Sequence, residues 1–376
     1  MFSHAIKLFS VSGFEIKVDP SWLLIATLIT WSLAQHYFPL SLPGYSNGAY
    51  LLMGLIAMLF FFASLLLHEL SHSVVARSNG VPIRGITLFL FGGMAELEAE
   101  PQSGRVEFWI AIAGPIMSFA LSGLFWILSS LSQAVGASAA LTEILSYLSL
   151  INLVLAIFNL VPAFPLDGGR ILRAYLWHRH GDILRATETA ARSGAIFAMI
   201  LIGLGVLAIF QGAAAAGLWQ VMIGLFVLTA ARSSYQMQLA KSVFGDRTVG
   251  ALVPGDPIIL SPEMSIQEAV DDIFLPNRIG FAPVMEKGTL LGYLDQKAVA
   301  EIGRSDWGKT TVGDAYRGLD PAIMVSPDLP VEELMTRIAQ SGRRKFLVVR
   351  DHDLLGVITL ADITEYLHLA ETLQRR

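Results

Sequence analysis

The chain has 376 residues, of which 54% are hydrophobic and only 15% are charged, and its formal net charge is −5. A typical soluble domain carries about 25% charged residues, so much of this chain is expected to lie in apolar surroundings. The negative net charge excludes a globally basic nucleic-acid-binding protein. Because the chain has no cysteine, any metal ligand must be His, Asp or Glu, and disulfide scaffolds and thiol catalysis are excluded.

Charge is distributed unevenly along the chain. Residues 1–240 carry 22 charged side chains, whereas the shorter stretch 241–376 carries 35. The first part has the composition of a membrane protein, and the second has that of a soluble domain. We therefore expect a membrane domain over 1–240 and a soluble domain over 241–376.

Six apolar runs in the first part are long enough to cross a bilayer as helices, which takes about 20 residues. The segment before the first run lacks a small-residue cleavage site, which favours a retained span over a signal peptide. The prediction is a polytopic α-helical membrane protein with six transmembrane helices, a short β segment after the second, and an α+β tail. We expect the spans at roughly 21–38, 49–72, 108–132, 144–163, 194–211 and 214–231.

The positions of Lys and Arg predict the orientation of these spans. Lys7 and Lys17 precede the first span, and the connections after the second and fourth spans and the tail after the sixth also contain basic residues. The other three connections contain neither Lys nor Arg. Because basic connections stay in the cytoplasm, we expect a multi-pass protein of the cell (inner) membrane with both termini cytoplasmic.

The second span ends in the sequence HELSH. His68 and His72 are four residues apart, so a helix places them on one face, where they can hold one metal ion. Glu69 beside them can take a proton from a water molecule. Two His and a Glu within an apolar helix are unfavourable unless they are paired or line a polar cavity, which favours a metal site over chance occurrence.

The connection after the second span predicts a β-hairpin. Residues 81–100 are rich in β-branched and aromatic residues, with a break at Gly92 and Gly93. An edge strand at this place can receive an extended peptide by strand addition. Alternatively, the hairpin only packs under the helices.

The fourth span runs into NLVPAFPLDGG, where Pro162 and Pro165 break the helix and Asp167 follows. Irregular backbone at membrane depth is tolerated where it lines a cavity or is buried in protein. Asp167 is then a third metal ligand, or else a solvated turn residue, although that alternative leaves the polar Asn159 unexplained. The second and fourth spans run in the same direction, so Asp167 and the His pair are expected at the same depth. Three protein ligands with a fourth position for water are typical of catalytic zinc.

HELSH at 68–72 together with NLVPAFPLDGG at 159–169 resembles the paired signatures of the site-2 protease family of intramembrane zinc metalloproteases. The resemblance implies that His68, His72 and Asp167 bind one Zn²⁺ per chain and that Glu69 is the catalytic base. It also implies that Asn159 contacts the substrate or the oxyanion. The expected substrate is a single-span membrane protein, cut within or near the bilayer in regulated intramembrane proteolysis.

The soluble tail contains an internal repeat in which 261–273 aligns with 326–338. Each repeat predicts a helix, two short strands and another helix, over about 245–304 and 312–370. The arrangement resembles a pair of CBS domains. The resemblance implies a module that binds adenine nucleotides (ATP, ADP or AMP) and that forms homodimers in many proteins.

The second repeat carries the residues expected of a nucleotide site. Thr359 and Asp362 fit a CBS pattern in which a hydroxyl lies near phosphate and a carboxylate binds ribose hydroxyls. The first repeat has Asp295 and Ala298 at these positions, so one nucleotide site is expected. Alternatively, Asp362 only caps the last helix.

The leading interpretation is an intramembrane zinc endopeptidase modulated by adenine nucleotide at the CBS pair, with no nucleic-acid partner. The alternative is a CBS-gated membrane transporter or channel, in which the buried His, Glu and Asp residues form an ion path. A transporter of this kind is expected to show an inverted repeat of broken helices, and the sequence does not indicate one. A catalytically silent scaffold gives no reason to place all four polar residues in apolar surroundings.

Overall fold

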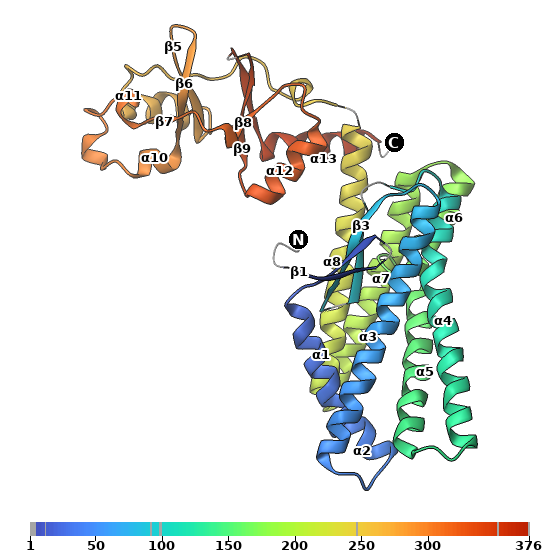
Figure 1. The fold of residues 1–376 in the computed structure, drawn as a ribbon. Coiled ribbons are helices and arrows are strands. Elements are labelled where there is room, and N and C mark those ends of the chain that lie inside the picture. The colour runs from blue at the N-terminus through green and yellow to red at the C-terminus, as the bar shows by residue number, and fades with distance from the viewer. Residues whose placement is uncertain are drawn as a thin grey trace. The chain divides into compact units, whose positions relative to one another are not determined.

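In the computed structural model, the described residues are 5–11, 13–90, 92–97, 100–245, 247–351 and 353–374. The chain forms two compact units, Met1–Gln236 and Met237–Arg376. Each is described separately below (Figure 1).

The first unit is a bundle of long apolar helices, and all six predicted spans are confirmed. The first span, Ser21–Ser41, combines α1 (Ser21–Ser32), a π-helical turn (Leu33–Tyr37) and α2 (Phe38–Ser41). The other five are α3 (Asn47–Ser78), α4 (Gly104–Ala134), α5 (Ala139–Asn159), α7 (Ile183–Phe210) and α8 (Ala214–Phe244). At 1.5 Å per residue, the 32-residue α3 is about 48 Å long, so it extends beyond the roughly 30 Å hydrocarbon core.

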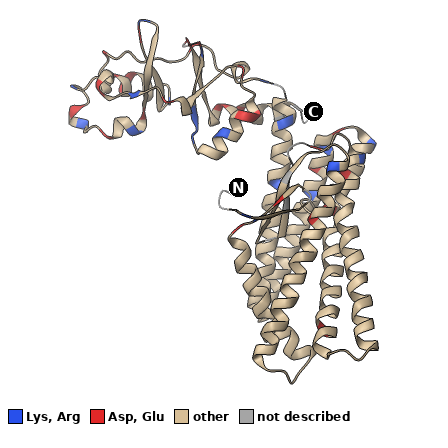
Figure 2. Cartoon of the chain, in the orientation of Figure 1, with Lys and Arg blue, Asp and Glu red and all other residues tan. Residues whose placement is uncertain are grey.

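Local sequence sets where these helices begin. The side chains of Ser46, Ser103, Ser138 and Asp182 accept hydrogen bonds from the backbone N–H groups three residues ahead, at the starts of α3, α4, α5 and α7. The charges gather at the end of the bundle where α6 and the β-strands lie, and the opposite end is almost free of them (Figure 2). A bilayer-embedded bundle is expected to show such a charge-poor stretch along its helices.

A four-stranded sheet lies at one end of the bundle, in the order β1-β2-β3-β4. The predicted hairpin after the second span is confirmed as β3 (Ile83–Phe89) and β4 (Gly92–Leu97), which are antiparallel. The sequence did not predict the second hairpin, β1 (Ile6–Val11) and β2 (Phe14–Val18). β2 joins β3 in parallel, so among the described strands β4 has only β3 beside it.

The segment between the fourth and fifth spans forms a further helix, α6 (Asp167–His180), which the sequence did not predict. The fourth span ends at Asn159 and not near 163, because the residue before a proline disfavours the helical conformation and Pro162 follows closely. Gly181 ends α6 in the left-handed conformation, with φ of 73°.

The second unit shows the predicted repeat of helix, two strands and helix. The first repeat contains α9 (Ile266–Glu268) with a π-helical turn (Ala269–Phe274), β5 (Phe281–Glu286), β6 (Thr289–Asp295) and α10 (Gln296–Ala300). The second repeat begins with α11 (Val312–Ala315) and β7 (Arg317–Gly318), and β7 pairs with β6 of the first. It continues with β8 (Met324–Val325), α12 (Val331–Ser341), β9 (Lys345–Arg350), β10 (Asp353–Thr359) and α13 (Leu360–Gln374). The two sheets have the orders β5-β6-β7 and β10-β9-β8.

The second unit also includes the last turns of α8. Leu239 and Phe244 are each only 2% exposed. The Phe244 ring stacks on Tyr366 of α13 with 5.8 Å between ring centroids, and Lys241 Nζ lies 3.5 Å from the Glu332 carboxylate of α12.

Candidate metal centre

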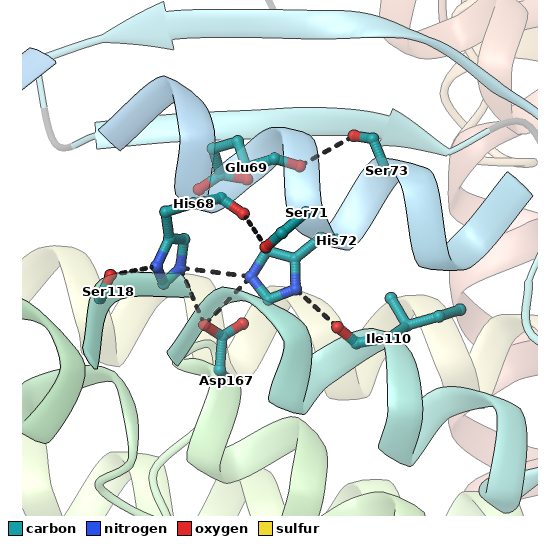
Figure 3. A network of polar contacts seen from close by, with 8 residues as sticks. All are labelled: His68, Glu69, Ser71, His72, Ser73, Ile110, Ser118 and Asp167. Carbon is teal, nitrogen blue, oxygen red and sulfur yellow. Dashed lines mark hydrogen bonds and ion pairs between the residues drawn. The ribbon is translucent and has the colours of Figure 1, made fainter. Parts of the chain in front are cut away.

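Helix α3 carries the two histidines on its buried face. His68 and His72 are 2% and 4% exposed, and their Nε2 atoms are 3.2 Å apart (Figure 3). The four-residue spacing accounts for this geometry, because residues one turn apart on a helix share a face.

Asp167 comes to the same point from the broken segment after α5. The break is held against α7, where the Phe164 N–H donates to the Ala190 carbonyl at 3.3 Å and the Ser193 hydroxyl donates to the Pro162 carbonyl. Asp167, which is 8% exposed, then opens α6, and its Oδ2 lies 3.2 Å from the Nε2 atoms of both His68 and His72.

The three donor atoms fit a zinc ion. A tetrahedral zinc with bonds of about 2.0–2.1 Å separates its ligand atoms by about 3.3 Å, close to the 3.2 Å seen on all three edges. His, His, Asp is the only set of three or more His, Cys, Asp or Glu residues with this convergence among the described residues. Two imidazole nitrogens and a carboxylate suit zinc better than Ca²⁺ or Mg²⁺, which prefer oxygen ligands.

The hydrogen bond on the far side of His72 supports the same interpretation. His72 Nδ1 lies 2.6 Å from the Ile110 carbonyl, which can only accept, so Nδ1 carries a proton. In the neutral ring, Nε2 then carries a lone pair, which faces the Asp167 carboxylate. Two groups that both accept repel each other at this distance, and a cation between them removes the conflict.

Glu69 lies next to this cluster and is not one of its donors. Its side chain is half-buried and packs against β4, so closely that a Cβ atom on Gly93 would lie 2.6 Å from Glu69 Cγ. The only strand beside β4 in the described sheet is β3. A carboxylate next to the three donors and beneath a sheet edge is suited to act as a general base on an extended peptide.

Sequence reasoning missed the contribution of α4. Ser118 Oγ lies 2.8 Å from His68 Nδ1, and the Ile110 carbonyl is the partner of His72. Between them, Gly114 packs so closely against the two rings that a Cβ atom there would overlap His68 Nε2 and His72 Nε2. The signal in the sequence was the small residues of AGP at 113–115, which also fit ordinary helix packing.

The structure does not link Asn159 to the donors. It is the last residue of α5 and is half-buried, and the hydrogen bonds found among the described residues include none from its amide. Asn152, which sequence reasoning passed over, is fully buried on the same helix. Its Nδ2 donates to Ser64 Oγ at 3.3 Å and to the Leu148 carbonyl at 2.8 Å, while its Oδ1 has no partner in the described structure.

In the second unit, Thr359 ends β10 and Asp362 lies in the first turn of α13. Asp362 Oδ2 accepts hydrogen bonds from the Thr359 backbone N–H and hydroxyl, both at 2.8 Å. The Asp362 N–H in turn donates to the Thr359 hydroxyl at 3.3 Å, so Thr359 is the N-cap of α13 and Asp362 completes a capping box with it. In the first repeat, Asp295 caps α10 by accepting from the Ala298 N–H at 2.8 Å.

Comparisons with known proteins agree with this architecture. The family model described as Peptidase family M50 matches residues 56–136 and 129–202, and that of the CBS domain matches 249–304 and 313–369.

Relatives from several organisms match nearly the whole chain. Rip3 from Mycobacterium tuberculosis is 35% identical over 361 residues, covering 96% of this chain and 92% of that protein. Zinc metalloprotease MJ0392 from Methanocaldococcus jannaschii is 31% identical over 369 residues, covering 98% of each. The solved site-2 protease from the latter organism is 31% identical, with a TM-score of 0.43, and covers 62% of this chain and 95% of that one. The identities of 35% and 31% to the two relatives, over more than nine-tenths of each chain, show that this chain belongs to peptidase family M50, the site-2 protease family of zinc metalloproteases, and it carries a CBS domain pair.

Proposed function

We propose that this protein is an intramembrane zinc endopeptidase that cleaves a transmembrane or membrane-proximal segment of a single-span membrane protein. The observation that carries the proposal is the convergence of His68, His72 and Asp167 within 3.2 Å of one another on apolar helices, with Glu69 beside them.

His68, His72 and Asp167 would hold the zinc ion, which when bound polarises a carbonyl and lowers the pKa of a water molecule to about 7. Glu69 takes the proton of the attacking water and delivers it to the leaving amine. Asn159, at the end of α5, is proposed to contact the substrate or the oxyanion.

The edge of β4 is the proposed binding place for the substrate. A peptide bond inside a helix is shielded by its own hydrogen bonds, so the substrate must be extended before attack. An extended segment can add to β4 by backbone hydrogen bonds. Two observations support this placement: β4 has one neighbour among the described strands, and Gly93 in it lies against Glu69.

The protein is proposed to lie in the cell membrane, with its metal centre at the cytoplasmic side. The basic residues before the first span, around the hairpin and in α6 support this orientation. A single Lys309→Cys substitution in this cysteine-free chain tests it. Lys309 is exposed in the second unit, so an impermeant thiol reagent should label the variant only after cells are permeabilised. Labelling in intact cells would contradict the orientation.

The CBS pair is proposed to bind one adenine nucleotide, at the second repeat, and to change the cleavage rate when it does so. Thr359 supplies a hydroxyl there, and Asp362 uses only one carboxylate oxygen, Oδ2, in capping α13. A homodimer through the CBS pair is also proposed, and the mass of the purified protein in detergent tests it.

The central proposal is tested on detergent-purified protein, with cleavage of a tagged single-span membrane protein as the activity. Wild type should hold about one zinc per chain. The variants His68→Ala and Asp167→Ala should lose both zinc and cleavage, and Glu69→Gln should lose cleavage while keeping zinc. A folded wild type without zinc, or a Glu69→Gln variant that cleaves at the wild-type rate, would overturn the proposal.

A further inference from the structure

Helix α4 contributes none of the three donor atoms, yet it contacts the Nδ1 atoms of both histidine ligands, the ring nitrogens that do not face Asp167. His72 Nδ1 meets a main-chain carbonyl of α4, and His68 Nδ1 meets the hydroxyl of Ser118 at 2.8 Å (Figure 3). Ser118 is 0% exposed and His68 is 2% exposed, so no bulk water competes for this hydrogen bond.

We propose that Ser118 is a positioning residue of the metal centre, and that its hydroxyl holds the His68 imidazole with Nε2 facing the donor atoms of His72 and Asp167. The inference rests on the proposed function, because it assumes that the three donors bind zinc. It assigns to α4 the role of setting the affinity for the metal.

The need for such a partner follows from the torsion of the histidine ring. Rotation about the Cβ–Cγ bond has two broad minima, related by a half-turn. A half-turn exchanges Nδ1 with Cδ2 and places Cε1 where Nε2 had been. The flipped ring then presents a carbon to the metal. The ring has nearly the same shape in both orientations, and the hydrogen bond at Nδ1 can form in only one of them, the one that presents Nε2 to the other two donors.

The two histidines have different partners for this purpose. The carbonyl of Ile110 belongs to the backbone, so side-chain substitution cannot remove it. The partner of His68 is a side chain and is therefore open to test. Hydrogen bonds to the second nitrogen of a ligating histidine typically contribute 10- to 100-fold to metal affinity.

Ser122 provides a matched control within the same helix. It lies one turn further along α4 and is also buried, at 8% exposed. Its hydroxyl donates to the Ser149 carbonyl of α5 at 2.9 Å, so it joins two helices and does not contact a histidine. A buried serine with a purely structural role is expected to behave like Ser122.

The experiment measures zinc affinity of the full-length protein in detergent by competition with a chromophoric chelator. Ser118→Ala should raise the zinc dissociation constant by about 10- to 100-fold, and Ser122→Ala should leave it within a factor of about two of wild type. Equal affinities for the two variants would overturn the inference. A wild type without zinc would instead overturn the proposed function, so the two failures are distinguishable.

A second pair of variants separates the hydroxyl from packing. Ser118→Thr and Ser118→Val place side chains of nearly equal size at this position, and only the first keeps a hydroxyl. The inference predicts that the Thr variant binds zinc at least about tenfold more tightly than the Val variant. Equal binding by this pair would show that the site responds to volume alone, and would overturn the assignment.

Discussion

At the scale of single residues, the metal centre depends on one position without a side chain. Gly114 of α4 faces the Nε2 atoms of His68 and His72, and there is no room for a Cβ atom between them. Interiors are close-packed, so an added methyl group must displace a neighbour. Here the neighbours are two metal ligands whose separation must suit a zinc ion.

We therefore predict that Gly114→Ala lowers zinc occupancy and cleavage together, with a loss of metal affinity of at least about tenfold. Gly123→Ala is the control, because a Cβ atom at this position of the same helix meets nothing within 4 Å. The control should bind zinc like wild type and unfold at the same or a slightly higher temperature, because Ala favours a helix over Gly. Metal analysis and thermal unfolding of both variants check this. Full zinc occupancy in Gly114→Ala would contradict the prediction.

The ligand candidates could be found from sequence because their spacing is periodic and their chemistry is unusual in an apolar segment. His68 and His72 lie one helical turn apart, and Asp167 follows a proline break that has no role in an ordinary span. Ser118, Gly114 and Asn152 could not be found in this way. Small or singly polar residues are common in membrane helices, and which neighbour they face depends on the rotation of the helix, which is a tertiary property.

At the scale of elements, a buried ion pair ties α4 to α6, the helix that Asp167 opens. The guanidinium of Arg173 donates to Glu107 Oε1, with its Nε at 2.8 Å, and it also lies over the Phe164 ring, 5.0 Å from the centroid. Glu107 is 0% exposed, and its Oε2 has no partner in the described structure. Removing one member of a buried pair leaves the other charge uncompensated, which destabilises by about 3–5 kcal/mol.

We predict that Glu107→Gln lowers the midpoint of thermal unfolding by several degrees and weakens zinc binding, because α6 then loses its attachment beside Asp167. The control is Glu15→Gln, which breaks the exposed pair between Lys7 and Glu15 at 2.6 Å in the N-terminal hairpin. Exposed pairs contribute little to stability, so this variant should unfold like wild type. Equal unfolding temperatures for the two variants would show that the ion pair between α4 and α6 does not contribute to stability.

Elements were predictable from the sequence where a property of the segment itself decides the structure. The six spans follow from apolar length, and the β3–β4 hairpin follows from its glycine break. Helix α6 was missed because it is short and carries several charges, so no apolar run reveals it. β1 and β2 were missed because a pair of short strands becomes stable only by joining a sheet, and β3 lies more than sixty residues away along the chain.

At the scale of the whole molecule, the two CBS repeats cap the helix after their second strand differently, and only the second repeat is expected to bind a ligand. Asp295 is the N-cap of α10, and Asp362 completes a capping box with Thr359 at the start of α13, so the variants Asp362→Asn and Asp295→Asn both weaken helix capping. If the nucleotide site lies at the second repeat alone, only Asp362→Asn should lose binding of AMP and ATP and any effect of these nucleotides on cleavage. Calorimetry and cleavage assays on the full chain check this. Loss of binding in both variants would show that only the fold of the pair matters.

The burial of the end of α8 has a consequence for anyone who wishes to isolate the CBS pair as a soluble fragment. Family matching begins the pair at residue 249, but Phe244, which is only 2% exposed, stacks on Tyr366 of α13. A fragment starting at 249 loses the aromatic partner of Tyr366 and leaves apolar surface on α12 and α13 open to self-association. A fragment starting at Met237 keeps this surface covered. Although it is longer than the fragment starting at 249, it is the one that should stay monodisperse without detergent.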